Sequence, residues 1–210
     1  MDAKTDELRD AHDALADFYV TYLDGQLAGD PIERSMLDLF SELTLAGGKD
    51  VADIGCGTGR LLPYLRDRGL TPRGVDLSPG MIETARRDHP EFPSEVADLR
   101  DLPFPDASLD GAVCWYSLIF LAPEAREAAF SELARVVKPG GFLVTAFKDG
   151  DGTRRRGGRA TGTGVEFDTY WLSAREMAER FTAAGFTKVF LGSRPFEPVP
   201  AGYLLVQRNG

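Results

Sequence analysis

Val51-Ala-Asp-Ile-Gly-Cys-Gly-Thr-Gly-Arg60 is the stretch that decides the fold. A short apolar run ends in a glycine-rich turn, and an amphipathic segment over residues 61–68 follows, which predicts a strand, a tight turn and a helix. The glycines let the backbone turn sharply and let a ligand approach it closely. The free N–H groups at the start of the helix point into the same turn. The stretch therefore predicts a ligand-binding turn at the end of a buried strand.

The spacing of these glycines argues against a dinucleotide site. The dinucleotide pattern Gly-x-Gly-x-x-Gly needs its third glycine at position 60, where this chain has Arg60. Asp53 lies at the end of the strand, and its carboxylate can pair with a ligand ammonium. The turn suits a nucleoside that carries an amino acid better than it suits a pyrophosphate.

Three further segments follow in order: Gly74-Val-Asp-Leu-Ser78, Ala97-Asp-Leu-Arg-Asp-Leu-Pro-Phe-Pro-Asp106 and Leu133-Ala-Arg-Val-Val-Lys-Pro-Gly-Gly141. Together with the glycine turn they resemble the motifs of class I methyltransferases that use S-adenosylmethionine (SAM). The resemblance is close over residues 49–147 and loose elsewhere. It implies a Rossmann-like, doubly wound α/β fold with a seven-stranded sheet, SAM as cofactor and S-adenosylhomocysteine as product.

The resemblance also implies a set of cofactor-binding residues. They are Tyr19, Asp53, Gly55, Cys56, Gly57, Gly59, Asp76, Leu77, Met81, Asp98, Leu99 and Trp115. Asp76 ends the second strand, 21 positions after Gly55, where its oxygens can accept both ribose hydroxyls. It can equally act as an acid at a helix N-terminus, since Ser78-Pro79 opens the next helix. Asp98 corresponds to the acid that accepts from the adenine amino group, or it is simply a turn aspartate.

Composition bounds the class of protein. The 210 residues are 43% hydrophobic, which predicts one globular domain with a core of its own. No apolar run approaches the ~20 residues that span a bilayer, and the charged N-terminus lacks a signal-peptide core, so we expect a cytoplasmic protein without a membrane segment. With only two cysteines, a disulfide framework is not expected. The net charge of −9 disfavours nucleic acid as a partner. The sequence does not indicate an oligomeric state.

The single domain divides into four segments by pattern. Residues 1–46 form N-terminal cap helices over 5–24 and 32–45, residues 47–147 the cofactor-binding core, 148–169 a mobile glycine- and arginine-rich loop, and 170–210 a C-terminal helix and hairpin. Core strands are expected at 71–77, 94–98, 109–117 and 141–147, with a helix at 123–137. The last two strands, 187–191 and 203–207, are joined by a proline-rich linker without helical pattern. They should therefore be antiparallel, since parallel crossovers need a longer and usually helical connection.

Aromatic residues mark the two sides of the expected site. Asp13-Ala-Leu-Ala16-Asp-Phe-Tyr19 resembles the start of many family members, which implies that Tyr19 lies near the methionine end of the cofactor. Alternatively, Tyr19 and Tyr22 pack on the core. Trp115 and Tyr116 fall at the carboxyl end of the fourth strand, where ligands bind in open α/β sheets. Strand alternation puts them on opposite faces, so at least one should be plain packing.

The 148–164 stretch is rich in glycine and basic residues and has no hydrophobic period. One interpretation is a solvated connection. The other is a lid that orders over an anionic acceptor through Arg154, Arg155, Arg156 or Arg159. The residues that we expect on the acceptor side are Tyr22, Tyr116, Arg154 and Arg155. No metal site is expected, because Asp149-Gly-Asp151 is too short for a calcium loop.

A hydroxyl acceptor needs a base to remove its proton. Many relatives have a histidine shortly after the fourth strand, but this chain has Phe120 near that place. His12 is the histidine that could act as a base, with Tyr19 and Tyr22 as other candidates, or proximity alone suffices. We therefore expect His12 and Tyr19 as the catalytic residues.

Several functions remain open at this point. The main prediction is methyl transfer to a hydroxyl or amine of a small metabolite. A nucleic-acid (tRNA) or protein methyltransferase is disfavoured by the acidic charge and by the lack of an Asp/Asn-Pro-Pro-aromatic motif, Asn209 being the sole asparagine. A non-catalytic SAM-binding protein is also compatible with the intact acids. A dehydrogenase is disfavoured by the glycine spacing and the terminal hairpin.

Overall fold

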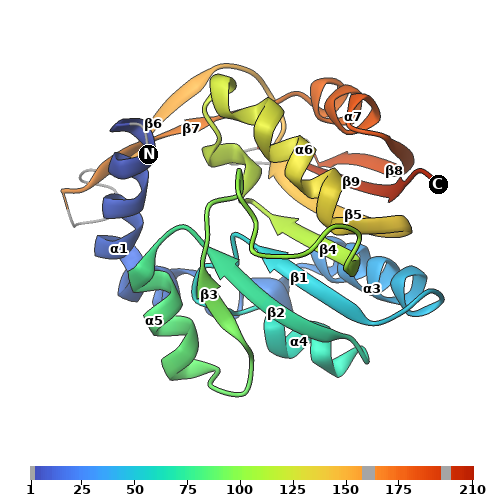
Figure 1. The fold of residues 1–210 in the computed structure, drawn as a ribbon. Helices are drawn as coiled ribbons and strands as arrows, with labels where there is room; N and C mark the ends of the chain where they lie inside the picture. The colour runs from blue at the N-terminus through green and yellow to red at the C-terminus, as the bar shows by residue number, and fades with distance from the viewer. Residues whose placement is uncertain (1–2, 158–163, 195–199) are drawn as a thin grey trace.

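The fold is built on a seven-stranded sheet in the order β3-β2-β1-β4-β5-β9-β8 (Figure 1). The computed structural model describes residues 3–157, 164–194 and 200–210. Strands β1 to β5 are mutually parallel where they pair, and β9 runs antiparallel to both β5 and β8. The strands are β1 (Asp50–Ile54), β2 (Thr71–Asp76), β3 (Ser94–Val96), β4 (Leu109–Trp115), β5 (Val137–Lys148), β8 (Phe186–Arg194) and β9 (Ala201–Arg208). The predicted Rossmann-like sheet and its antiparallel C-terminal hairpin are confirmed.

Helices cover both faces of this sheet (Figure 1). They are α1 (Ala3–Leu23), α2 (Gln26–Gly29), α3 (Pro31–Leu45), α4 (Leu62–Asp67), α5 (Pro79–Asp88), α6 (Arg126–Val136) and α7 (Ala174–Ala183), with short 3-10 turns at Leu118–Phe120 and Pro123–Ala125. On one face Phe130 of α6 and Phe181 of α7 meet edge to face, with their ring centroids 4.7 Å apart. On the other face Phe40 of α3 is fully buried against the strands. Burial of these aromatics from both sides fixes the sheet as the middle layer.

Helix starts follow the expected capping chemistry. Asp30 accepts from the backbone N–H groups of Ile32 and Glu33 and so caps α3, which begins at Pro31. Ser78 and Ser173 cap α5 and α7 in the same way, through N–H groups three residues further on. The predicted N-terminal helices are therefore present, with ends that differ by one or two residues from those expected.

Helix α1 lies at the carboxyl edge of the sheet and crosses from α5 to the hairpin formed by β6 (Thr153–Gly157) and β7 (Glu166–Tyr170) (Figure 1). The Asp13 carboxylate accepts from the Ser78 hydroxyl and, at 2.8 Å, from the Gly80 N–H at the start of α5. At its other end, the Arg155 guanidinium of β6 reaches the Glu7 carboxylate. Helix α1 is thus fastened to both sides of the region where the parallel strands end.

The glycine- and arginine-rich segment is not an unstructured loop over its described part. Strand β6 (Thr153–Gly157) pairs antiparallel with β7 (Glu166–Tyr170) in a separate two-stranded sheet. The prediction of a structureless connection over 148–169 was wrong here, because packing of β7 against α1 supplies order that local composition does not reveal. Arg159 and the linker prolines at 195 and 198 lie outside the described residues.

Candidate functional site

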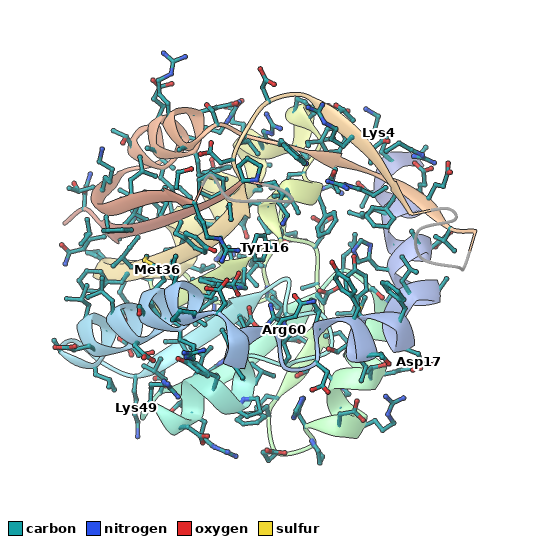
Figure 2. All side chains as sticks on the ribbon, turned by 180° about the vertical axis from the view of Figure 1, so that it is seen from behind. Lys4, Asp17, Met36, Lys49, Arg60 and Tyr116 are labelled. Atoms are coloured by element: carbon teal, nitrogen blue, oxygen red, sulfur yellow. The ribbon has the colours of Figure 1, made fainter. Side chains whose placement is uncertain are left out.

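A cavity of about 640 Å³ opens at the carboxyl ends of β1, β2 and β4, beneath α1 and the β6–β7 hairpin. This is within the usual size range for small-molecule sites. The residues predicted for the site that line it are His12, Tyr19, Tyr22, Asp53, Gly55, Cys56, Gly57, Asp76, Leu77, Met81, Asp98, Leu99, Trp115 and Tyr116. Arg60 and Tyr116 lie toward the middle of the molecule in Figure 2, whereas the exposed Asp17 marks the outer side of α1.

Asp53 at the end of β1 is the least satisfied acid of the cavity. Its side chain is 1% exposed, and within the described residues neither carboxylate oxygen has a hydrogen-bond partner. Burial raises the pKa of Asp53 to about 7, opposed by the charge of Arg60 and reinforced by that of Asp76. A buried carboxylate without partners costs free energy that a ligand cation would recover.

The glycine turn leaves its backbone open to the cavity. Gly55, Gly57 and Gly59 all have positive φ, between 54° and 80°. A Cβ on Gly57 would meet no atom nearer than the Met81 sulfur, at 4.0 Å, so this position faces free space. Gly59 does not line the cavity; a Cβ there would press against α4 and α5 at 3.2–3.3 Å. The third glycine therefore allows helix packing, and the first two shape the turn.

Asp76 at the end of β2 ties the glycine turn to α5. One carboxylate oxygen accepts from the Gly57 N–H at 2.8 Å and the other from the Ser78 N–H at 2.9 Å. Burial raises the pKa of Asp76, and these two hydrogen bonds oppose the shift. Each oxygen keeps a second acceptor position. The structural role and a hydroxyl-binding role are compatible at this residue.

Asp98 lies in the turn after β3 and forms a bidentate ion pair with Arg100. The Arg100 Nε and Nη2 atoms approach its two oxygens at 2.6–3.1 Å, and the Arg100 N–H also donates to it. Arg100 reaches Thr5 of α1 as well, at 3.1 Å. This end of the cavity is therefore closed by a charged pair.

Glu33 on α3 is a site residue that the sequence did not reveal. It is 7% exposed, and it accepts from the Tyr116 hydroxyl at 2.8 Å and from the Trp115 indole N–H at 3.3 Å. Its only sequence signal is an acid in a first helical turn, which the helix dipole explains. The expectation that Trp115 and Tyr116 point to opposite faces was wrong. Tyr116 has φ of 57°, which ends the strand alternation and brings both rings to one carboxylate.

His12 on α1 is enclosed by aromatic rings. Phe120 meets it edge-on at 4.7 Å, Phe167 lies at 5.1 Å, and Tyr19 stacks on it at 5.8 Å between ring centroids. Its Nδ1 lies 2.9 Å from the Leu8 carbonyl oxygen, which only accepts, so the proton of the neutral ring is assigned to Nδ1. Burial lowers the pKa of His12. The ring is therefore neutral at physiological pH, and Nε2 is the basic nitrogen.

Basic residues gather at the side of the cavity away from Asp98. They are Lys148 at the end of β5, Arg156 on β6 and Arg194 on β8. Arg154 and Arg155, which the sequence singled out, do not line the cavity. Arg155 instead forms ion pairs with Glu7, Glu166 and Asp168. Pairing of β6 with β7 decides which arginine reaches the cavity, and that pairing was not predicted.

Within residues 3–157, 164–194 and 200–210, no group of three or more histidine, cysteine, aspartate or glutamate side chains could hold a metal ion. No helix within the same residues is long and apolar enough to cross a membrane.

Comparisons with known proteins agree with this geometry. The family described as "Methyltransferase domain" matches residues 51–141. The chain is 36% identical over 97 residues to a malonyl-[acyl-carrier protein] O-methyltransferase from Serratia marcescens, covering 46% of this chain and 37% of that protein. It is 32% identical over 143 residues to a demethylmenaquinone methyltransferase from Beutenbergia cavernae, covering 66% and 59%. The chain thus spans about half or less of the length of most relatives it matches.

A solved structure shares the fold over most of the chain. The magnesium protoporphyrin IX methyltransferase from Synechocystis, with bound S-adenosylhomocysteine, superimposes with a TM-score of 0.73 at 19% identity, covering 98% of this chain and all of that one. At this identity the likeness concerns the fold.

Proposed function

This chain belongs to the class I SAM-dependent methyltransferase family, and we propose that it transfers a methyl group from SAM to a hydroxyl or amine of a small metabolite. The observation that carries the proposal is Asp53, a buried carboxylate without partners beside an open glycine turn. Such a site calls for a ligand with a cationic group and a body that can approach backbone closely. SAM has both.

The residues present fit this cofactor. Asp53 would take the ammonium of the methionine moiety, and Arg60, whose charge acts on Asp53, would take the carboxylate. Asp76 would accept from the ribose hydroxyls with the acceptor positions that Gly57 and Ser78 leave free. Asp98 would accept from the adenine amino group, and the buried Met81 would pack against the ring. In this proposal residues 47–147 bind the cofactor, while 1–46 and 148–169 enclose the acceptor.

The reaction is an in-line displacement. SAM supplies the methyl group, and its sulfonium sulfur is the leaving group, which departs as a neutral thioether. The protein positions the acceptor, excludes water and takes up a proton when the acceptor is a hydroxyl. His12 is suited to the last task because Nδ1 is held by the Leu8 carbonyl and Nε2 has no hydrogen-bond partner among the described residues. Tyr19 is less suited, since burial raises its pKa to about 12. We therefore assign the base to His12 and a packing role to Tyr19.

Calorimetric titration with SAM, S-adenosylhomocysteine and NAD in parallel tests the cofactor. We expect the first two to bind and NAD not to bind. Asp76→Ala should weaken SAM by about 10-fold, roughly 1.4 kcal/mol, because it removes acceptors for the ribose. Asp17→Ala is the matched control: this aspartate is 90% exposed on the outer side of α1 and should bind SAM as the wild type does (Figure 2). Binding of NAD alone, or of none of the three ligands, would contradict the proposed function.

Replacement of His12 by glutamine should reduce kcat for a hydroxyl acceptor by about 100-fold, the low end of general-base effects. SAM affinity should change little, since the basic nitrogen acts on the acceptor. For an amine acceptor, assayed above its own pKa, the same variant should lose much less. Equal losses with both acceptors would show that His12 only packs against Tyr19, Phe120 and Phe167.

A further inference from the structure

The side of the cavity opposite Asp98 is built around Lys148. This residue ends β5, the strand next to β4, so its side chain starts from the carboxyl edge of the sheet where ligands bind. Its Nζ lies 4.7 Å from the centroid of the Tyr116 ring, a cation–π contact. No ion pair of Lys148 with a carboxylate is found among the described residues. Burial lowers the pKa of Lys148, the charge of Glu33 opposes this shift, and Arg156 and Arg194 add to it.

Arg156 forms the outer part of the same cavity wall. Its guanidinium carbon lies 5.7 Å from the Trp171 ring centroid, so the group makes a cation–π contact and is not held by a carboxylate. Like Lys148, it has no carboxylate partner within the part of the chain described. The neighbouring arginines of β6 differ: Arg155 is bound by acids, and Arg154 lies over Trp171 without lining the cavity.

The acids on this side of the cavity are already engaged. Glu33 accepts from Tyr116 and Trp115, two neutral donors. Asp30 caps α3 and pairs with Arg194. Lys148 and Arg156 are thus basic side chains of this wall without a carboxylate partner among the described residues. Two such cations on one wall favour an anion between them.

We propose that the methyl acceptor carries an anionic group, a carboxylate or a phosphate, which binds between Lys148 and Arg156, with an apolar body lying among the aromatic side chains of the cavity. The inference rests on the proposed function, because it takes the rest of the cavity to be filled by SAM. In the proposed function the carboxylate of SAM itself is assigned to Arg60, which follows the glycine turn and acts on Asp53. Lys148 and Arg156 are thereby left for the acceptor.

The aromatic side chains of the remaining cavity wall indicate what the uncharged part of the acceptor is. Tyr19, Tyr22 and Phe120 come from α1 and the turn after β4, and Phe167 and Trp171 from the hairpin side. Flat apolar surface of this kind binds aromatic or similarly planar groups. An acid with a phenyl ring is therefore the simplest probe of the site.

The test uses the full chain saturated with S-adenosylhomocysteine and three probes: phenylacetate, phenyl phosphate and the neutral phenylacetamide. Calorimetry should show at least one of the two anions binding about 10-fold or more tightly than the amide. Lys148→Met and Arg156→Gln should each reduce this preference to about 3-fold or less. Arg154→Gln, on the same strand and stacked on the same tryptophan, should keep it. The ratio between phenylacetate and phenyl phosphate tells which anion the site accepts.

Several outcomes overturn the inference. They are equal binding of anion and amide, a preference that survives both Lys148→Met and Arg156→Gln, and no binding of either anion up to about 10 mM, where a Kd of about 1 mM is readily seen. Loss of S-adenosylhomocysteine affinity in Lys148→Met with the anion preference intact would assign this lysine to the cofactor. If the wild type does not bind S-adenosylhomocysteine at all, it is the proposed function that fails. The probe titrations without it then still decide whether the two cations bind an anion.

Discussion

Asp53→Asn is expected to weaken SAM binding by about 1000-fold, roughly 4 kcal/mol, and at the same time to stabilise the ligand-free protein. The first effect follows because the asparagine amide leaves the ligand ammonium buried without a counter-charge. The second follows because the wild-type carboxylate is buried without hydrogen bonds in the described structure, so that ionising it costs free energy. Replacing a residue whose charge favours the bound ligand but destabilises the ligand-free fold lowers the ligand affinity and raises the stability of the ligand-free protein.

The pH dependence of both quantities follows from the pKa of Asp53, which burial raises to about 7. The folded protein holds a proton that the unfolded chain has already lost above about pH 4, so Asp53 makes the ligand-free fold less stable as pH rises from about 4 to 7. SAM needs the ionised carboxylate. Its affinity should therefore increase up to about 10-fold per pH unit below pH 7 and level off above it. Asp53→Asn should remove both dependences.

Thermal unfolding and calorimetry at about pH 8 measure the two effects. We expect Asp53→Asn to raise the ligand-free stability by on the order of 2 kcal/mol, less than the full pKa shift implies because asparagine is itself polar and buried. Asp110→Asn is the control. Asp110 is also buried, but it accepts from Lys138 and from the Asp50 N–H outside the cavity, so this variant should lose stability and keep SAM binding. Unchanged SAM affinity in Asp53→Asn would refute the assignment.

Gly55→Ala should destabilise the protein by about 3 kcal/mol. The new Cβ would lie 2.2 Å from the Ser117 Cβ, a distance that no packing tolerates, and Gly55 has φ of 80°, which adds a left-handed penalty of about 1 kcal/mol. For a chain of this length the melting temperature should fall by about 6–12 °C. SAM binding should weaken too, since Ser117 and the turn must shift within the cavity wall.

Two other glycines serve as controls that separate the steric clash with Ser117 from the backbone penalty of a positive φ. Gly140 also has positive φ, 81°, but a Cβ there meets nothing within 4 Å, so Gly140→Ala isolates the backbone penalty. Gly47 has neither feature beyond a 3.9 Å contact with the Thr44 carbonyl, so Gly47→Ala should be close to neutral. If Gly55→Ala cost no more than Gly140→Ala, the close approach of Ser117 would not hold in solution.

How much of this could be predicted from the sequence depends on whether a residue acts through its own motif or through a distant partner. Asp53 and Asp76 end strands whose apolar pattern is local, so both the strands and the positions of the acids could be predicted. Glu33 and Lys148 could not be assigned, because their importance arises from pairing with Tyr116, far along the chain. The β6–β7 hairpin could not be predicted for a similar reason. Strand β6 is polar and flanked by glycines, and it forms a strand only because it pairs with β7, which packs against α1.

The fastening of α1 has a consequence for how this chain could acquire new acceptors. The Glu7–Arg155 ion pair joins residues that are 148 positions apart in the sequence. Both of its residues belong to the enclosure and not to the glycine turn. Exchange of the N-terminal helices alone with those of a relative would break this pair, whereas exchange together with the β6–β7 hairpin would preserve it. An attempt to alter acceptor choice should therefore exchange the two segments together, although the proposed cofactor-binding core, residues 47–147, separates them in the sequence.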